Sequence, residues 1–314
     1  MQTECMREDS LDKESITRGI EVFISEQSVL NGWTDATIRK FKEMGKHLNN
    51  YDSQMQLKDF GHETLFHLVE YYLRTGMRNS TLMKQLDLLR WFLRWAEARG
   101  MIRDKTWREF RPHLTLVPRK VIFLRWEELI RLYEFRLPPG RCELQHVRDL
   151  FCLQCFTSLR FSDVHALLGS QVHDDHIELV TQKTADSLII ELNKYSRSIL
   201  QRNAGRHGAY AMPRVSIQHA NRLLKELCRM AGIDEMVHEV WYEGNKRCQR
   251  TSPKFQLIST HCGRRTFICN SLAMGIPAET VMQWTGHSNY NAMKPYIAIA
   301  NEERRKAMSL WNVR

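Results

Sequence analysis

The chain has 314 residues, of which 43% are hydrophobic and 26% charged, a composition that excludes a disordered or fibrous protein. Lys and Arg outnumber Asp and Glu by 46 to 36, and the resulting net charge of +10 indicates a polyanionic partner. Neither a membrane helix of roughly 20 apolar residues nor the apolar core of a signal peptide is evident. We therefore expect a two-domain cytoplasmic protein with reduced cysteines.

Helical spacing of apolar residues dominates residues 1–117. Thr34 or Asp35 can cap a first helix, and further helices are expected from about Glu63 to Gly76 and from about residue 79 to residue 99. The pattern predicts a small helical bundle. Its arginines either contact phosphate groups or form a solvated surface, and the sequence leaves both open for Arg74, Arg78, Arg90 and Arg94.

Residues 118–123 are short, basic and marked by a proline, which predicts a linker to a second domain at residues 124–314. A turn at Lys183–Asp186 between two apolar runs predicts a β-hairpin, and Glu243–Asn245 predict the turn of another. We expect a mainly α fold with small β-hairpins. Helices are expected from residue 126 and at about 142–158, 216–232, 261–274, 277–284 and 301–310.

Cys152 and Cys155 form a C-x-x-C pair inside the apolar run Leu150–Phe156. A zinc site needs further ligands, and no second pair or ligand cluster accompanies them. We interpret both residues as small apolar side chains of a buried helix, and no metal site is expected.

A set of charged and aromatic residues is spread through the second domain. A guanidinium offers paired donors that match phosphate oxygens, a histidine moves protons near neutral pH, and a phenol can attack phosphorus. The set is therefore suited to cutting a nucleic-acid backbone, and this chemistry needs no metal or other cofactor. Its members are Arg160, Lys183, His261, Arg264, His287 and Tyr296.

Each member has an expected role. Arg160 and Arg264 neutralise the charge that grows on the non-bridging oxygens, and the two histidines add donors or move protons. Tyr296 is the nucleophile, and its attack conserves the bond energy as a phosphotyrosine, so ATP is not needed. Lys183, in the predicted hairpin turn, protonates the departing 5′ oxygen.

Taken one at a time, these residues also have ordinary structural interpretations. Arg160 can cap a helix or pair with Asp163, and Lys183 can be a simple turn lysine. Tyr296 can be an interface aromatic, and Tyr290 is a rival nucleophile three residues after His287. The joint spacing, rather than any single member, favours the catalytic interpretation.

The motifs resemble those of the tyrosine recombinases of the phage integrase family. That family combines an arginine in a Thr-Gly-Leu-Arg-like turn, a hairpin lysine, a His-x-x-Arg box, and a Gly-His pair followed nine residues later by a tyrosine. The segments Arg264–Phe267 and Met293–Ile297 look especially like integrases of bacterial conjugative transposons and other mobile elements. The matching positions are Arg160, Lys183, His261, Arg264, His287 and Tyr296, with Asp163 where the family often has a supporting acidic residue.

The resemblance implies a fold, an activity and partners. Residues 1–117 would be a SAM-like core-binding domain, and residues 124–314 a catalytic domain of the DNA breaking-rejoining type with a C-terminal tail. The implied activity is cutting and rejoining double-stranded DNA through a 3′-phosphotyrosine and a Holliday junction. The implied assembly is a homotetramer on two recombination sites, with accessory DNA-bending proteins, in the integration or excision of a mobile element on the bacterial nucleoid.

Three positions qualify the resemblance. Ser158 stands where the family usually has glycine, and Thr285 where an apolar residue usually precedes Gly-His, but neither replaces a catalytic group. Pro295 fixes the backbone before the tyrosine and is expected to break a helix there.

In the tail, an apolar set either packs on its own domain or docks on a neighbouring protomer: Ala300, Ala307, Met308, Leu310 and Trp311.

Three alternative functions remain compatible with the residues. A type IB-like topoisomerase would use the same phosphotyrosine step without strand exchange. A DNA-binding regulator built on a decayed recombinase would have lost catalytic residues, whereas the full set is present. A housekeeping dimer-resolving recombinase differs from a mobile-element integrase in its biological role rather than in its chemistry.

Overall fold

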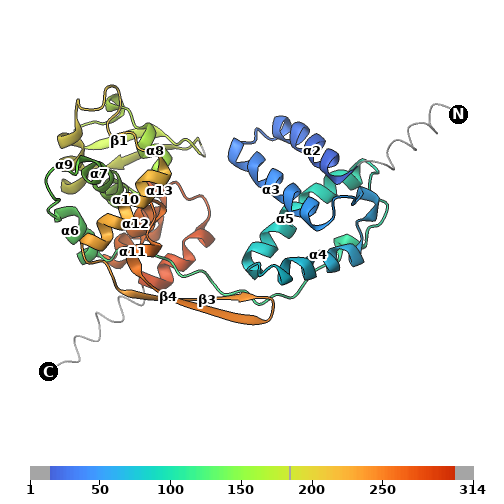
Figure 1. Cartoon of the computed structure of the whole chain (residues 1–314). Coiled ribbons are helices and arrows are strands. Elements are labelled where there is room, and N and C mark those ends of the chain that lie inside the picture. The colour runs from blue at the N-terminus through green and yellow to red at the C-terminus, as the bar shows by residue number, and fades with distance from the viewer. Residues whose placement is uncertain (1–14, 184, 301–314) are drawn as a thin grey trace. The chain divides into compact units, whose positions relative to one another are not determined.

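The computed structural model describes residues 15–183 and 185–300 (Figure 1). The chain divides into two compact units. The first unit comprises Met1–Pro118 together with Glu239–Arg250, and the second comprises Arg119–His238 and Thr251–Arg314. The inserted segment 239–250 is the tip of a β-hairpin, which the sequence placed in the second domain.

The first unit is a bundle in which α2, α3 and α4 all pack against α5 (Figure 1). The predicted helices at residues 35–48, 63–75 and 79–99 are all present, and α2 adds one that the sequence analysis did not predict. The elements are α2 (Ile16–Leu30), α3 (Asp35–Tyr51), α4 (His62–Arg74) and α5 (Asn79–Ala98), with the short 3-10 turns η1 (Leu57–Asp59) and η2 (Thr106–Arg108).

The core of the first unit is built around the ring of Phe23 on α2, which is fully buried. Edge-to-face contacts with centroid separations of 5.1 to 5.5 Å join it to the rings of Trp33, Phe41, Phe92 and Trp95. Such pairs add to the free energy of burying aromatic area. Because the rings come from α2, α3 and α5 and from the turn between α2 and α3, they fix how these helices pack.

Three of the four arginines that the sequence left open have structural partners. Nη2 of Arg74 lies 3.9 Å from Oε1 of Glu70, an exposed ion pair within α4. Arg90 donates to Asp87 Oδ1 at 2.9 Å and to the carbonyl of Phe110 at 3.1 Å. The guanidinium of Arg78 lies 4.0 Å from the centre of the Trp241 ring, a cation–π contact with the hairpin tip.

The hairpin tip is held to the start of α5 by one buried side chain, Asn79, which is 1% exposed. Its Nδ2 donates to the carbonyl of Gly244 at 2.9 Å and to that of Thr115 at 3.0 Å. In return, the amide of Gly244 donates to Asn79 Oδ1 at 2.7 Å. An amide side chain has both a donor and an acceptor, so it can satisfy a turn backbone in both directions.

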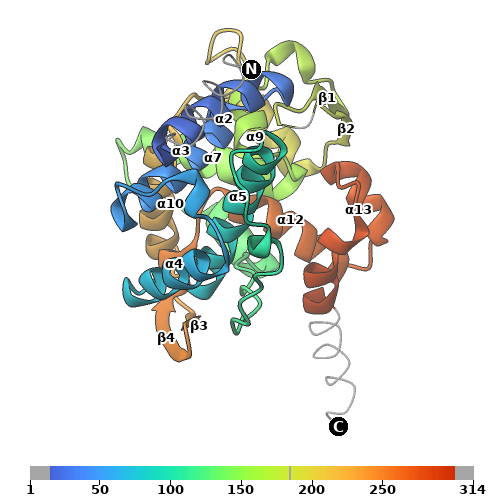
Figure 2. The same ribbon diagram turned by 90° about the vertical axis from the view of Figure 1, so that its right-hand side faces the viewer.

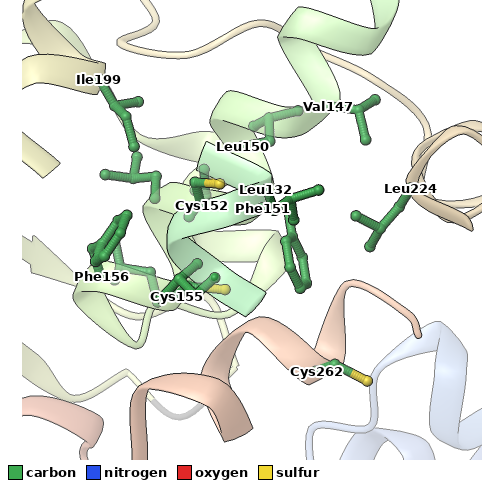
Figure 3. Packing of buried hydrophobic residues seen from close by; sticks show 14 of the residues in the cluster. Leu132, Val147, Leu150, Phe151, Cys152, Cys155, Phe156, Ile199, Leu224 and Cys262 are labelled. Carbon is green, nitrogen blue, oxygen red and sulfur yellow. The ribbon is translucent and has the colours of Figure 1, made fainter. Parts of the chain in front are cut away.

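The second unit is organised around α7, which contacts α6, α8, α9, α10 and α12. Figure 3 shows apolar side chains of this helix, among them Cys152 and Cys155, together with others that pack around it. Both cysteines are free and buried, and burial raises the pKa of Cys152 to about 12. A thiol that stays protonated is neither a nucleophile nor a ready metal ligand. The interpretation of both as apolar core residues is therefore confirmed.

Residues 294–300 are helical, which was not predicted. The other helices of the second unit follow the predicted ones closely, apart from three that were not predicted, α8, α9 and α11. They are α6 (Trp126–Glu134), α7 (Cys142–Thr157), α8 (Phe161–Ala166), α9 (Lys194–Asn203), α10 (Ile217–Met230), α11 (Lys254–Leu257), α12 (His261–Ala273) and α13 (Ala278–Thr285), with the turns η3 (Gly169–Gln171) and η4 (Tyr290–Ala292).

Two antiparallel hairpins complete the fold. β1 (His176–Val180) pairs with β2 (Ser187–Glu191) in the register Glu178 to Ile189, and α13 lies against β2 (Figure 2). β3 (Met236–Glu243) pairs with β4 (Lys246–Pro253). The fold is mainly helical with small β-hairpins, as predicted. The predicted helix at 301–310 and most of the tail lie outside the described residues.

Across the described part of the chain, no helix combines the length and the apolarity that crossing a bilayer requires.

Candidate active site

A turn with an unusual backbone presents the first arginine. α7 ends at Thr157, and Ser158 then adopts a left-handed conformation with φ 65°. Glycine is favoured at such positions because a side chain is strained there. Ser158 offsets part of this cost by donating from Oγ to the carbonyl of Trp284 at 2.9 Å. The turn leads directly to Arg160, which precedes the first residue of α8.

The second arginine is placed by close packing of α12 on α7. A Cβ at Gly263 would lie 2.7 Å from Cβ of Gln154, so only glycine permits this approach of the two helices. The next residue, Arg264, is 4% exposed. Burial of a guanidinium is costly unless its N–H groups are bonded, which explains the partners around it.

Arg264 connects three segments of the second unit. Its Nη1 donates to the carbonyl of Ser158 at 3.2 Å, and its Nη2 donates to the carbonyl of Thr285. Nη2 also lies 3.4 Å from Nε2 of His287. Burial, and then the nearby charge of Arg160, lower the pKa of Arg264 to about 10, so it remains charged at neutral pH.

His287 follows the left-handed Gly286 that ends α13. Its Nδ1 lies 2.7 Å from Oγ1 of Thr285, and that hydroxyl lies 2.8 Å from the carbonyl of Val281. Because a carbonyl only accepts, the hydroxyl proton points to Val281, and Nδ1–H of His287 donates to Oγ1. Burial, followed by the charges of Arg264 and Arg160, lowers the pKa of His287 to about 4.

Asp163 connects the first arginine to the lysine turn. Asp163 is a buried residue, 3% exposed, and Oδ1 of its carboxylate accepts a hydrogen bond from the backbone amide of Gln182 at 2.9 Å. Oδ2 lies 3.9 Å from Nη1 of Arg160, which is an ion pair but too long for a hydrogen bond. Lys183 is exposed in the turn after β1, one residue beyond the bonded amide. Asp163 thus anchors the turn that carries the lysine.

His261 is the first residue of α12 and is exposed on the surface. Its pKa is lowered first by the protein atoms that displace water around it and then by the positive charges of Arg265, Arg264 and Lys183. The lysine turn and the start of α12 therefore share one electrostatic environment, and it is strongly positive. An anion entering it would be attracted and would raise the pKa of His261.

Tyr296 lies on the helical residues 294–300 and is partly buried against a small apolar cluster, which consists of Ile268, Leu272, Val281, Met293 and Ala300. Its electrostatic effect on Arg264 is to raise the pKa of that guanidinium, so the phenol lies near the arginine. The rival Tyr290 is 48% exposed on η4. Pro295 occupies the first turn of the helix, where its missing N–H costs nothing, so the expected break at this position was wrong.

The structure thus brings Arg160, Arg264 and His287 together and links Lys183 to Arg160 through Asp163. Nη1 of Arg160 is buried and makes no hydrogen bond within residues 15–183 and 185–300. A buried, charged donor without an acceptor suits an anionic oxygen. The sequence did not identify the supporting roles of Ser158 and Thr285, although both had been noted as departures from the family pattern.

Comparison with known proteins gives the fold a name. Residues 20–112 match the family described as the phage integrase SAM-like domain. A lambda integrase fragment, in a dimer bound to a COC′ core site, aligns with a TM-score of 0.70 at 15% identity, covering 90% of this chain and 95% of that one. The chain has the lambda integrase fold.

Two further structures share the integrase fold. The Tn1549 transposon integrase in complex with circular intermediate DNA has a TM-score of 0.66 at 15% identity, covering 92% of this chain and 99% of that one. A lambda integrase tetramer bound to a Holliday junction has a TM-score of 0.68 at 15% identity, covering 90% of this chain and 80% of that one. None of the curated proteins matches the sequence.

Proposed function

We propose that this chain is a tyrosine-type site-specific recombinase that cuts and rejoins DNA through a 3′-phosphotyrosine. The observation that carries the proposal is the cluster of Arg160, Arg264 and His287, with Tyr296 close enough to alter the pKa of Arg264. A cationic cluster beside a partly buried phenol has the two components that phosphoryl transfer to tyrosine needs. The integrase fold and the SAM-like domain at residues 20–112 support the same activity.

The first task of the site is to bind the scissile phosphate. Arg264 is fixed by bonds to the backbone of Ser158 and Thr285, so it presents its charge without reorganising during the reaction. Arg160 has a buried donor available for a non-bridging oxygen. His287 carries its proton on Nδ1 and is neutral at pH 7, and its Nε2 faces Arg264. The two preorganised guanidinium groups stabilise the charge that develops in the transition state.

Strand cleavage then exchanges one ester for another. The phenolic oxygen of Tyr296 forms a bond to phosphorus, and the bond from phosphorus to the 5′ oxygen breaks. The phenolic proton passes to a neutral histidine of the site, and we propose that Lys183 delivers a proton to the departing 5′ oxygen. Rejoining reverses these steps when a 5′ hydroxyl of another strand attacks the phosphotyrosine and releases the phenol.

We further propose four protomers on two double-stranded sites, exchanging strands through a Holliday junction during integration or excision of a mobile element. Related folds have been seen as a dimer on a core site and as a tetramer on a Holliday junction. Accessory DNA-bending proteins and a bacterial cytoplasmic location, on the nucleoid, complete the proposal. Residues 1–117 would act as the core-binding domain, 118–123 as the linker and 124–314 as the catalytic domain.

The deciding test is covalent trapping on DNA taken from the regions that flank the coding sequence. In a nicked substrate, cleavage releases a short fragment that carries the 5′ hydroxyl. Rejoining is then impossible, so the protein stays attached to the DNA, and denaturing gels detect the adduct. Tyr296→Phe should abolish the adduct while DNA binding stays near the wild-type level, because only one oxygen is removed. Tyr290→Phe is the matched control and should form the adduct normally.

The same preparations discriminate between the alternatives. An adduct that persists in Tyr296→Phe and disappears in Tyr290→Phe would transfer the nucleophile to Tyr290. Relaxation of any supercoiled plasmid without a specific site would favour a topoisomerase. A wild-type protein that binds the flanking DNA but forms no adduct would favour a non-catalytic regulator.

A further inference from the structure

The turn that leads into β1 gathers three side chains that can each bind a metal ion. One ring nitrogen of His173, one of His176 and one carboxylate oxygen of Glu178 all lie within 4.8 Å of one another. In a tetrahedral zinc centre with bonds of about 2.0–2.1 Å, neighbouring donor atoms are about 3.3 Å apart. His173 and Glu178 are exposed, so rotation of their side chains can close this gap without moving the backbone.

The backbone already holds the two histidines in place. The amide of His173 donates to the carbonyl of His176 at 2.9 Å, and Val172 bridges to Ile177 across the same turn. The two imidazole rings are stacked, with centroids 4.5 Å apart and an interplanar angle of 22°. Glu178 lies two residues after His176 on β1 and therefore on the same face of the strand.

Asp175 orients one of the rings. Its Oδ1 lies 2.6 Å from Nδ1 of His176. If Nδ1 carries the proton, the lone pair of His176 is on Nε2 and is available to a metal. A carboxylate that holds the second nitrogen of a histidine is the usual support of a metal-binding imidazole.

The charges around the turn also favour a cation. Asp174, Asp175 and Glu178 contribute three carboxylates, and Arg197 faces them, with Nε donating to the carbonyl of Asp174 at 3.0 Å. Glu191 lies opposite His176 on β2 but accepts a hydrogen bond from Trp284, so it is committed elsewhere.

We propose that His173, His176 and Glu178 form a binding site for a divalent transition-metal ion, with Zn²⁺ as the expected ion. Two imidazoles and one carboxylate suit zinc, whereas Mg²⁺ and Ca²⁺ prefer oxygen ligands alone. Water would complete the coordination. The site takes no part in strand cleavage: it lies where β1 begins, whereas Lys183 lies in the turn beyond the other end of that strand.

A bound ion would stabilise the hairpin that carries Lys183. Any ligand that binds only the folded chain raises its stability in proportion to the logarithm of the ligand concentration above Kd. The ion would join the residues before β1 to the strand itself. The measurable consequence is a melting temperature that rises with Zn²⁺ and does not change with Mg²⁺.

The test uses the full chain without a histidine tag, freed of metal and kept reduced. Titration calorimetry with ZnCl₂ should show saturable one-to-one binding by the wild type. His173→Gln should weaken it roughly ten- to a hundredfold, and Glu178→Gln should weaken it as well. His238→Gln is the control, because His238 is exposed and hydrogen-bonded to Thr251 away from this turn. It should bind Zn²⁺ like the wild type.

Each outcome decides the matter. Equal affinity in the wild type and both ligand variants would refute the site, as would an equal loss in His238→Gln. The absence of wild-type binding would refute it too. Circular dichroism of each variant shows whether it is folded. If His173→Gln does not fold, Glu178→Gln still tests the site. Tyr296→Phe should bind Zn²⁺ normally, which separates this proposal from the proposed recombinase activity.

Discussion

The protonation state of His287 follows from its two neighbours. Thr285 Oγ1 accepts from Nδ1, while burial and then the positive charge of Arg264 oppose a second proton on the ring. A neutral imidazole at pH 7 is the result, held in one tautomer. Such a group binds a phosphate oxygen only by taking up a proton or by turning, so DNA binding should raise its pKa.

The first residue-scale prediction concerns pH. The pKa of His287 is about 4 in the folded chain, below the ordinary histidine value of 6.5, so between these values the unfolded chain binds more protons. His287 therefore contributes fully to stability above about pH 6.5, and this contribution is lost as the pH falls toward 4. NMR titration of the ring should give the low pKa, and urea unfolding from pH 4 to 7 should show the loss.

Two variants make this prediction specific. His287→Gln should remove the contribution of His287 to the pH dependence of the free energy of unfolding. The difference in this free energy between the variant and the wild type should therefore shrink as the pH falls. Thr285→Val removes the acceptor of Nδ1–H and should mix the two tautomers, which nitrogen chemical shifts distinguish. A ring that titrates near 6.5 in the wild type would contradict the proposed environment.

The sequence could propose the charged residues of the candidate site because each belongs to a short motif with recognisable chemistry. It could not show that the carbonyl of Ser158 bonds to Arg264, a residue 106 positions later. Nor could it show that Thr285 fixes the tautomer of His287. Both depend on where the backbone turns in space, and neither leaves a periodic signal in the chain.

At the scale of elements, apolar periodicity predicted most of the helices and both hairpins. It missed α9, whose buried positions include the polar Ser196 and Asn203, and the six-residue α8, which is too short to show a period. It also missed α2, although Ile16, Ile20 and Phe23 have helical spacing. For α8 and α9, tertiary contacts rather than an apolar stripe stabilise the helix.

The element-scale prediction concerns the contact between α5 and the β3–β4 tip. Asn79→Ala would leave the amide of Gly244 and two carbonyls without their partner, at a cost of about 1–3 kcal/mol. Hydrogen exchange at the Gly244 amide should accelerate, and urea should unfold the first unit at lower concentration. Ser80→Ala is the control on the exposed neighbouring position and should change neither. Unchanged exchange at Gly244 in Asn79→Ala would show that the side chain does not hold the tip.

At the scale of the whole molecule, the net charge of +10 and the cationic site predict that the affinity for DNA falls steeply as the salt concentration rises. The affinity for a 30-base-pair duplex, followed by fluorescence anisotropy, should fall linearly on a log–log plot against salt. Lys183→Ala should reduce the slope by about 1, the loss of one phosphate contact. Lys46→Ala should leave the slope unchanged, because Lys46 pairs with Glu43 on the first unit. An equal change in both variants would show that Lys183 contributes only general charge.

The path of the chain has a consequence for its synthesis. The first unit begins at residue 1, but its last part, Glu239–Arg250, is made about 130 residues after Pro118. At roughly 5–20 residues per second, a ribosome needs on the order of 7 to 26 seconds for that stretch. During this interval, Asn79 has no turn to bond and Arg78 has no indole to cover. The amino-terminal bundle of the nascent protein therefore cannot complete its native contacts until residues 239–250 have been synthesised.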